Sequence, residues 1–417
     1  MHKAVVIFII FITCFSGGTH AAYIDSVKFE GLTRTKEAYL RSLIICKEGL
    51  EVDSTILQRD VDLLKNLNLF FDVYGRLEGN DSITNVVFEV REANYIYPVV
   101  WMSGFKDQLK LILGVNHINF LGRAQEVGFT YQYYDRHSFY LFWRANRHSN
   151  KRTGHEIALQ KYSTIEPLYF QDTMSYFDFD NYSVLLGGHV WITRFLKAGL
   201  GGKYMYENYT QRDDAYLLPG KKFEFNKYQI HTGFTFNNVR ATYERQHGFD
   251  ASVYGEYIHT QGYPEASFLK FVSKLTYYRE FYKRGNIALR GQFSAATNNE
   301  SPFSPFVLDG ILNVRGIGNR VERGTAELIF NAEYRCTFWK LKWFSFQSTL
   351  FADYGTLREP GKQFDTFFDG DEVNLFLGGG LRFNLNVWYK TSLRVDYSFN
   401  PTNTKLHGIT FGIGQFF

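Results

Sequence analysis

The chain has 417 residues, of which 18% are aromatic, and a formal net charge of +4. Because basic and acidic residues are interspersed along the sequence, this small excess of positive charge gives no indication of a nucleic-acid partner. The mean hydropathy of −0.25 does not exclude a membrane protein, since each strand of a transmembrane β-barrel presents only alternate residues to lipid.

Residues 1–21 have the pattern of a secretory signal peptide. Lys3 supplies a positive charge, and the apolar run at 4–15 is too short to cross a membrane as a helix. Thr19 and Ala21 then provide the small side chains that precede a cleavage site. The chain is therefore expected to be exported.

Residues 23–93 predict a small α/β domain. Apolar residues at helical spacing between Leu57 and Leu67 indicate an amphipathic helix, for which Asp53 provides an N-cap. In chain order we expect a strand at 23–29, a helix at 37–45, a second helix that reaches Leu67, and strands at 71–77 and 83–90.

From residue 95 to residue 417 the chain predicts an all-β transmembrane barrel. Apolar and polar residues alternate in segments of about 8 to 14 residues, each of which indicates a strand. Leu393 and Val395, for example, oppose Arg394 and Asp396, which would be costly on a lipid face and suit a wet lumen. We expect about sixteen antiparallel strands, with fourteen as the alternative, because single-chain bacterial barrels have even strand numbers.

The connections between these strands are unequal in length. Outer-membrane barrels have long connections on the outer side and short turns on the inner side. The short side is expected to face the periplasm, together with the N-terminal domain. The long connections are expected at 166–180, 210–222, 297–323 and 357–372.

The connection at 297–323 contains the most informative motif, Val-Arg-Gly-Ile around Arg315. The strand that follows places Glu327 and Glu333 on its polar face, and the next strand places Asp353 on its polar face. Arginine binds such carboxylates through two parallel hydrogen bonds. We therefore predict that the loop folds into the barrel and is latched to the wall. The alternative is that the carboxylates only hydrate the lumen.

The last ten residues, 408–417, alternate between large apolar residues and small or polar ones. In a soluble protein such a terminal strand would be an exposed edge, whereas closure of a barrel in lipid removes the edge. We therefore expect the final strand to pair with an earlier one. Its apolar face is expected to carry Ile409, Phe411, Ile413, Gln415 and Phe417.

The order and spacing of these motifs make the chain resemble the BamA/TamA superfamily of outer-membrane assembly and translocation proteins, also called the bacterial surface antigen family. Residues 23–93 are similar to one POTRA domain, including the segment LKNLNLFFDV at 64–73. The glycine-rich segment at 378–383 is similar to the family's antepenultimate strand. The family's terminal signal strand corresponds to Phe411, Ile413, Gln415 and Phe417.

The family's loop motif is Val-Arg-Gly followed by an aromatic residue, with acidic partners on the lumen wall. In this chain the motif and its partners correspond to Val314, Arg315, Gly316, Ile317, Glu333 and Asp353. Ile317 departs from the usual aromatic residue, which weakens a stacking role at that position.

The resemblance implies a sixteen-stranded barrel in the outer membrane of a Gram-negative-type cell, with weakly paired first and last strands. Pro98 lacks a ladder donor in the first strand, at 96–104, and Gly412 and Gly414 would weaken the last strand. A seam that opens is therefore plausible. The alternative is that Pro98 only marks the start of the strand and that the glycines make room for lumenal side chains.

The resemblance also implies the partners. The POTRA domain would receive unfolded β-barrel or secreted polypeptide clients by edge-strand addition, and the client would pass through the seam or the lumen. Outer-membrane lipid, periplasmic chaperones and accessory envelope proteins are further expected partners. Because relatives usually carry more than one POTRA domain, a chain with one could be a reduced or accessory member.

Enzymatic function is not expected. The 11 His are scattered, and no catalytic triad or metal-ligand spacing emerges, so no cofactor is predicted either. Cys46 and Cys336 fall in different predicted domains, which argues against a disulfide. Two other functions stay open: a passive outer-membrane channel, and an accessory or structural subunit of a larger envelope complex.

Overall fold

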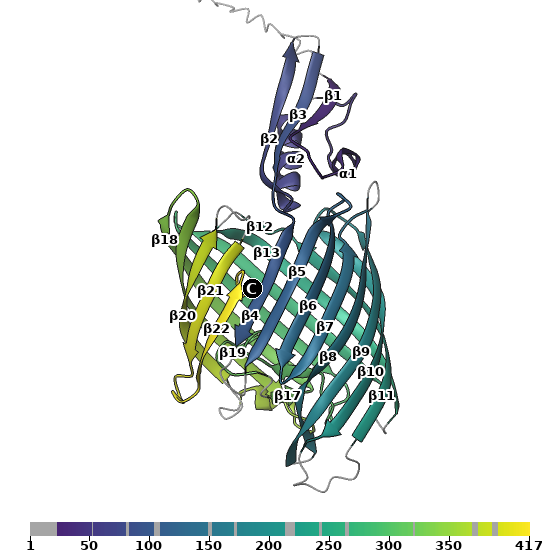
Figure 1. Ribbon diagram of the computed structural model, residues 1–417, viewed down its shortest axis with the longest axis vertical. Helices are drawn as coiled ribbons and strands as arrows, with labels where there is room; N and C mark the ends of the chain where they lie inside the picture. The colour runs from purple at the N-terminus through teal and green to yellow at the C-terminus, as the bar shows by residue number, and fades with distance from the viewer. Residues whose placement is uncertain are drawn as a thin grey trace, which may run out of the picture.

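The structure is a computed structural model, and the predicted signal peptide at 1–21 lies outside the residues it describes. It contains an N-terminal α/β domain and a β-barrel, which are stacked end to end (Figure 1). The residues described are 23–51, 53–80, 83–103, 109–148, 152–170, 173–212, 222–241, 244–262, 267–319, 322–368, 374–385 and 391–417.

The N-terminal domain has a three-stranded sheet in the order β1-β3-β2, in which β1 and β3 are parallel and β2 and β3 are antiparallel. The side chain of Asp53 accepts a hydrogen bond from the N–H of Thr55 (2.7 Å) and caps α2, as the sequence predicts. The elements are β1 (Ile24–Glu30), α1 (Glu37–Leu43), α2 (Ser54–Asn66), β2 (Phe70–Asn80) and β3 (Ile83–Glu92).

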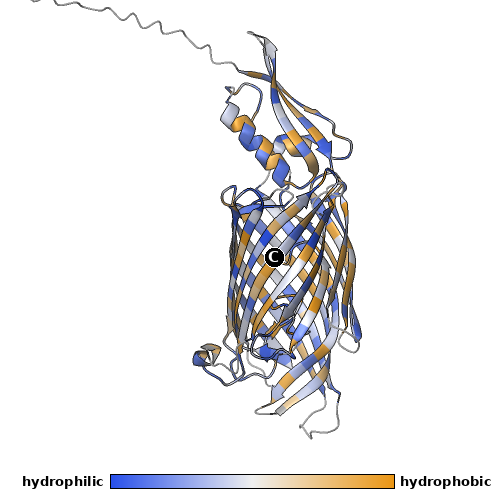
Figure 2. Cartoon of the chain, turned by 90° about the vertical axis from the view of Figure 1, so that its left-hand side faces the viewer, coloured by the Kyte–Doolittle hydropathy of each residue, from blue (hydrophilic) through white to orange (hydrophobic). Residues whose placement is uncertain are grey.

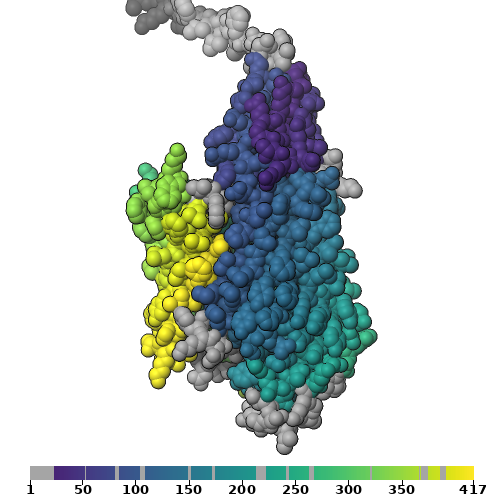
Figure 3. Space-filling model, viewed as in Figure 1, coloured from purple at the N-terminus to yellow at the C-terminus, as the bar shows by residue number. Residues whose placement is uncertain are grey.

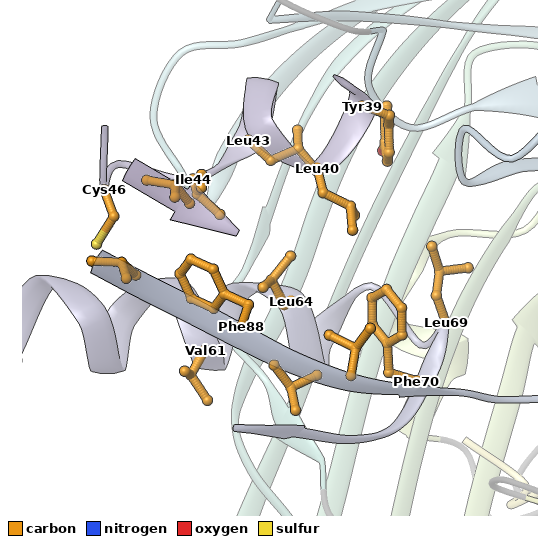
Figure 4. Close-up of a cluster of buried hydrophobic side chains, with 14 of the residues drawn as sticks. Tyr39, Leu40, Leu43, Ile44, Cys46, Val61, Leu64, Leu69, Phe70 and Phe88 are labelled. Atoms are coloured by element: carbon orange, nitrogen blue, oxygen red, sulfur yellow. The ribbon is translucent and has the colours of Figure 1, made fainter. Parts of the chain in front are cut away.

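One apolar cluster holds this domain together. Figure 4 shows the helices and the sheet contributing side chains to a common core. Leu64 of α2, Leu40 of α1 and Phe88 of β3 are completely buried. Burial of each such side chain stabilises the domain by about 1.5–3 kcal/mol, so a domain of this size can fold around a single core.

Sixteen antiparallel strands close into the barrel, which confirms the predicted number (Figure 1). A short segment, β12 (Arg240–Ala241), also pairs with β13. The sixteen strands are β4 (Ile96–Ser103), β5 (Lys110–Phe120), β6 (Gln125–Tyr134), β7 (Arg136–Ala145), β8 (Thr153–Phe170), β9 (Thr173–Trp191), β10 (Leu196–Gln211), β11 (Lys222–Asn237), β13 (Gln246–Gly262), β14 (Phe268–Phe281), β15 (Gly285–Ala296), β18 (Ala326–Lys340), β19 (Phe344–Arg358), β20 (Asn374–Leu385), β21 (Thr391–Phe399) and β22 (His407–Ile413).

The barrel strands alternate between the two faces of the wall. Leu350 and Leu381 point outward and are 68% and 59% exposed, whereas Asp353 and Arg382 point inward and are buried. The hydropathy pattern along the strands in Figure 2 follows this alternation. An apolar outer face and a polar inner face are what a lipid-embedded barrel requires. Among the residues described, no helix has the length and apolarity to cross a membrane.

Two predicted boundaries are wrong. The segment 166–180 is not a long connection, because β8 and β9 continue through most of it as a hairpin. Phe177 and Phe179 of this hairpin pack into an inward-facing aromatic cluster with Phe303, and this burial extends the strands. The last strand ends at Ile413 and does not reach Phe417. Gly414 has φ +96°, a left-handed conformation that turns the chain out of the strand.

The N-terminal domain contacts one end of the barrel, here called the proximal end; the opposite end is the distal end (Figure 3). Asn119, at the end of β5, donates to the hydroxyl of Thr35 (2.9 Å), and Thr35 also hydrogen-bonds to Tyr95 (3.0 Å). The N–H of Lys36 donates to the carbonyl of Gly122 in the β5–β6 turn (2.8 Å). These hydrogen bonds hold the domain on the barrel.

Glu92 orders the chain segment that makes this contact. Its carboxylate accepts hydrogen bonds from the Thr33 hydroxyl, from the N–H of Arg34 (3.0 Å) and from the N–H of Thr35 (2.8 Å). Burial by itself raises the pKa of this carboxyl, but the hydrogen bonds from Thr33 and Thr35 outweigh it and lower the pKa to about 2.

We therefore expect Glu92→Gln to weaken the docking segment. A carboxyl whose folded pKa lies below its ordinary value of 4.5 contributes stability above that value and loses it as the pH falls toward 2. At pH 7 the variant should lose about 1 kcal/mol, the value of a hydrogen bond or two at a partly exposed site. Amide hydrogen exchange of residues 33–36 in the full chain measures this loss.

The difference in amide exchange between the parent protein and Glu92→Gln should shrink as the pH falls from 4.5 to 2. Glu78→Gln is a suitable control, because Glu78 makes only an exposed ion pair with Arg76. Equal exchange in Glu92→Gln and the parent protein at pH 7 would contradict this role of Glu92.

Candidate lumenal site and seam

The connection between β15 and β18 folds back into the distal end of the barrel. Two short strands at its base, β16 (Phe306–Leu308) and β17 (Glu322–Gly324), pair with each other. Between them, the carboxylate of Asp309 accepts from the backbone N–H two residues later (2.9 Å), and Gly310 donates to the carbonyl of Gly318 (2.6 Å). The loop is therefore shaped by its own hydrogen bonds as well as by the barrel wall.

Arg315 lies in this loop and is completely buried. Its Nε donates to one oxygen of Asp353 (2.8 Å) and its Nη2 donates to the other (3.0 Å), which is the forked geometry of a strong arginine–carboxylate pair. The backbone N–H of Arg315 adds a third bond to the same carboxylate (3.1 Å). Asn331 also donates to Asp353 (2.8 Å), so this carboxylate is held by the loop and by the neighbouring strand.

Glu333 lies beside this pair and is shared among three arginines. It accepts from Nη1 of Arg315 (3.4 Å), from Nε of Arg335 (3.2 Å) and from Nη2 of Arg382 (3.1 Å). Arg382 also donates to Asp396 (2.6 Å). The structure therefore brings Arg315, Glu333 and Asp353 together, within a larger buried network on β18 to β21.

Two aromatic rings cover the faces of the Arg315 guanidinium. The guanidinium carbon lies 3.5 Å from the ring centroid of Phe351 and 4.3 Å from that of Phe416. A desolvated contact of this kind contributes about 2 kcal/mol. These ring contacts help to shield the guanidinium from water.

The other residues of the motif explain how the loop fits the wall. Val314 packs over Gly355, where a Cβ would lie 2.5 Å from a methyl group of the valine. Gly316 has φ +89°, and a Cβ there would lie 2.2 Å from the Ser398 hydroxyl, so this position requires glycine. Ile317 is partly buried against the apolar cluster that contains Val314.

The same loop contacts both strands at the junction of β22 and β4, here called the seam. A Cβ at Gly408 of β22 would lie 3.0 Å from the Cα of Gly316. On the other side, Asn319 donates to the carbonyl of Ser103, the last residue of β4 (3.3 Å). The loop therefore lies across the distal end of the seam.

The seam is short where the structure describes it. Among the described residues, three pairs join β22 to β4: Thr410 with Ser103, Phe411 with Met102, and Gly412 with Trp101. By contrast, β4 pairs with β5 through eight residues and β21 pairs with β22 through seven. In the proximal half of β4, no strand pairing to β22 is seen for Ile96, Pro98, Val99 or Val100 among the residues described.

The seam residues singled out in the sequence take different positions. Pro98 lies in the proximal half of β4 and, among the residues described, pairs with Val115 of β5 and not with β22. Gly412 belongs to the last pair of the seam, and Gly414 is the turning point after the strand. Phe411 and Ile413 stay in β22, whereas the residues after Gly414 turn into the lumen.

Several residues of the site were missed by sequence reasoning, in particular Arg382 and Phe416. Alternation places Arg394 and Asp396 in the lumen but does not indicate that Asp396 lies 3.5 Å from Arg315. One signal was available: Arg382 and Arg394 are directly opposite each other on adjacent strands. Like charges in that position repel, so a shared anion was to be expected, and Asp396 provides it.

Among the residues described, no group of three or more His, Cys, Asp or Glu is placed to hold a metal ion. The contacts that the site does contain are buried ion pairs, hydrogen bonds and cation–π contacts.

Comparison with protein families agrees with this architecture. The Omp85 superfamily domain matches residues 119–417, and the POTRA family, described as a surface antigen variable number repeat, matches residues 22–93. No curated protein matches the sequence.

Solved structures with the same fold are distant in sequence. BamA from Haemophilus ducreyi lacking POTRA domains 1–3 is 14% identical, with 94% of this chain and 84% of that chain covered and a TM-score of 0.57. CdiB from Acinetobacter baumannii is 12% identical, with coverage of 94% and 74% and a TM-score of 0.60. CdiB from Escherichia coli is 11% identical, with coverage of 95% and 91% and a TM-score of 0.55.

The Omp85 match covers most of the barrel, and the barrel and the N-terminal domain have the fold of these structures. The chain therefore belongs to the Omp85 superfamily, as an outer-membrane β-barrel protein with one POTRA domain.

Proposed function

We propose that this protein inserts polypeptides into the outer membrane or moves them across it, and that a client strand engages the proximal half of the seam. The observation that carries the proposal is the seam itself. The three pairs described lie at the distal end of β4, whereas Ile96 and Pro98–Val100, next to the POTRA domain, pair with β5 and show no pairing to β22 among the residues described.

The interaction energies favour opening of the barrel wall at the seam. A cross-strand side-chain pair contributes about 0.2–1 kcal/mol, so the side chains of the three pairs described add only roughly 1–3 kcal/mol to the seam. Unpaired backbone groups in the hydrocarbon region cost several kcal/mol each. The proximal half of β4 therefore gains from any extended segment that supplies further hydrogen bonds, and a client strand is such a segment.

The POTRA domain offers a second edge on the proximal side. In the sheet order β1-β3-β2, strand β2 lies at an edge and exposes Tyr74 and Leu77 by 61% and 45%. We propose that this edge receives an extended client by strand addition before it reaches the barrel. The proximal end would then face the periplasm, where chaperones and accessory envelope proteins deliver the client.

The lumenal loop acts as a latch in this proposal. The pairing of Arg315 with Asp353 and Glu333 fixes the loop, and the loop in turn touches both strands of the seam. Val314, Gly316 and Ile317 fit the latch to the wall. The role of Phe411, Ile413, Gln415 and Phe417 as a terminal assembly signal stays a prediction.

A passive channel is the weaker alternative. Arg315, Val314 and Phe376 are all completely buried, so at the level of the loop the lumen is occupied by side chains. A role as an accessory subunit of a larger envelope complex is also compatible with this seam. An experiment is needed to distinguish that role from the proposed function.

Depletion of the protein followed by outer-membrane proteomics tests the proposal. We expect a defined set of barrel or secreted proteins to fall in abundance before general envelope damage appears. An unchanged proteome, together with ion conductance that persists after deletion of residues 23–93, would favour the passive channel. Loss of one large complex alone would favour the accessory role.

The latch makes a prediction for Arg315→Ala. Removing one partner of a buried ion pair leaves uncompensated charges, here on Asp353 and Glu333, and costs about 3–5 kcal/mol. The variant barrel should therefore unfold at a lower temperature, measured as the temperature at which its folded form is lost in gel electrophoresis.

The matched variants are Asp353→Asn and the double variant. If the two residues act as a pair, the double variant should lose less stability than the sum of the two single losses. Arg315→Lys keeps the charge but not the fork and should be intermediate. An unfolding temperature unchanged in Arg315→Ala would exclude the latch.

The seam makes a prediction for engineered disulfides. Cysteines replacing the opposed residues Ser103 and Thr410, or Met102 and Phe411, should close the seam under oxidising conditions. Two adjacent pairs are needed because hydrogen-bonded and non-hydrogen-bonded pairs alternate and differ in Cα separation. We expect the oxidised protein to fail to complement depletion.

A reductant should restore activity in the same cells, and each single cysteine variant should behave as the parent. If the oxidised double variants support normal levels of the dependent proteins, the client does not pass through the seam.

A further inference from the structure

Two neighbouring turns at the proximal end of the barrel carry aromatic and basic side chains together. The first joins β14 to β15 and comprises residues 281–284, and the second joins β18 to β19 and comprises residues 338–346 (Figure 1). The two are adjacent because β15 pairs with β18, and the N–H of Thr337 donates to the carbonyl of Arg284 (2.9 Å). These two segments are here called the rim.

A β-bulge turns two consecutive aromatic side chains of the rim outward. Phe338 follows the outer face of β18 by alternation, and the pairing of β18 with β19 shifts by one residue between Thr337 and Trp339. Trp339 then lies opposite Phe346, which shares its face with the exposed Leu350. The rings of Phe338 and Trp339 both stack on Phe346, with centroids 6.1 Å and 5.7 Å away. The bulge thus doubles the aromatic surface on the outer face at this place.

The rim lies at the level of the lipid headgroups. Strand β19 runs from Phe344 to Arg358, and Leu350, near its middle, is exposed on the outer face. From Leu350 to Trp343 the chain covers about 23 Å along the strand, at ~3.3 Å per residue. With Leu350 at the mid-plane and a strand tilt of about 40°, Trp343 lies ~18 Å from the mid-plane, beyond the half-height of an apolar band about 25 Å tall.

The two tryptophans have the surroundings of interfacial residues. Trp339 and Trp343 are 53% and 57% exposed, and Trp343 packs edge-on against Phe344 (4.3 Å). Neither indole N–H has a hydrogen-bond partner among the residues that the structure describes. An apolar ring with a free N–H suits the boundary between acyl chains and headgroups, where the N–H can donate to a phosphate or ester oxygen.

Basic side chains accompany these rings. Lys283 and Arg284 are exposed in the first turn, and Lys340 and Lys342 are exposed in the second. Within the described part of the chain Lys283 and Arg284 make no ion pair, whereas Lys340 pairs with Glu244 (3.0 Å). The two rim segments contain no Asp or Glu. The rim therefore has four positive charges and no negative charge of its own.

We infer that the rim binds the phosphate headgroup of an anionic phospholipid in the leaflet at the proximal end of the barrel. Phe338, Trp339 and Trp343 pack against the ester region and the first part of the acyl chains, while Lys283 and Arg284 contact the phosphate. Basic residues close to the surface of a membrane gain from anionic lipid.

Charge complementarity selects the occupant. A zwitterionic phospholipid offers the same acyl chains and the same ester oxygens but no net charge, so four basic groups without a carboxylate among them favour the anionic lipid. The inference requires only that the barrel lies in a membrane, and it does not rest on the proposed function.

Quenching of tryptophan fluorescence by brominated lipids tests this preference. The full chain is reconstituted in phosphatidylcholine vesicles that contain brominated phosphatidylglycerol or, at the same mole fraction, brominated phosphatidylcholine. Bromine quenches an indole only at short range. Because the chain has 6 Trp, the signal of the rim is the difference between the parent protein and the double variant Trp339→Phe with Trp343→Phe.

This difference signal should be quenched at least twice as strongly by the anionic lipid as by the zwitterionic one. Equal quenching by the two lipids would overturn the preference for an anionic headgroup. No quenching by either lipid would place the rim outside the membrane and would also overturn the inference.

The double variant Lys283→Gln with Arg284→Gln tests the basic residues. It should bring the ratio of anionic to zwitterionic quenching close to one. Lys362→Gln with Lys405→Gln is the matched control, because it removes two exposed lysines from connections at the distal end, and it should leave the ratio unchanged. A ratio unaffected by the rim variant would overturn the role of Lys283 and Arg284.

Salt provides a test that needs no substitution of a basic residue. In about 1 M salt the screening length is about 3 Å, so the quenching ratio of the parent rim should fall toward one. A ratio that stays at its low-salt value would overturn the electrostatic preference. The lipid preference in a protein whose depletion leaves the outer-membrane proteome unchanged would support the rim site while rejecting the proposed function.

Discussion

The buried ion pair between Arg315 and Asp353 is the contact on which the rest of the lumen depends. A guanidinium and a carboxylate that are both removed from water are stable only if their geometry is good and their remaining hydrogen-bonding groups are satisfied. Asn331 and Glu333 meet that requirement on one side, and the rings of Phe351 and Phe416 exclude water on the other. The lumen wall from β18 to β21 is therefore arranged around one loop residue.

This pair also accounts for the asymmetry of the seam. The loop that carries Arg315 touches Gly408 of β22 and Ser103 of β4, so the part of the seam that is paired is the part that the loop covers. Residues 415–417 do not continue β22 along the proximal half, because Gly414 turns the chain into the lumen, where Arg335 donates to the backbone carbonyl of Phe417. Pairing at the distal end, and its absence among the described residues at the proximal end, are two results of the same set of lumenal contacts.

Sequence patterns predicted the parts of this arrangement that depend on local periodicity. Alternation identified the barrel, and it placed Glu333 and Asp353 on the lumenal face behind the Arg315 loop. It failed where long-range burial decides the structure. The hairpin of β8 and β9 continues because Phe177 meets Phe303 of a distant loop, which no local pattern indicates. Phe417 was expected on an apolar strand face, but a ring that covers a buried guanidinium, here that of Arg290, gains cation–π energy that a hydropathy pattern does not contain.

The POTRA domain lies at the proximal end of the barrel, next to the start of β4. Its strand β3 ends at Glu92 and β4 begins at Ile96, so three residues of chain separate the sheet of the domain from the proximal end of β4. The hydrogen bonds of Thr35 and Lys36 to the β5–β6 region fix the domain at this short distance. In the proposed function, a polypeptide added to the domain's sheet would lie close to the proximal half of β4, so the POTRA domain could pass an extended client directly to the seam.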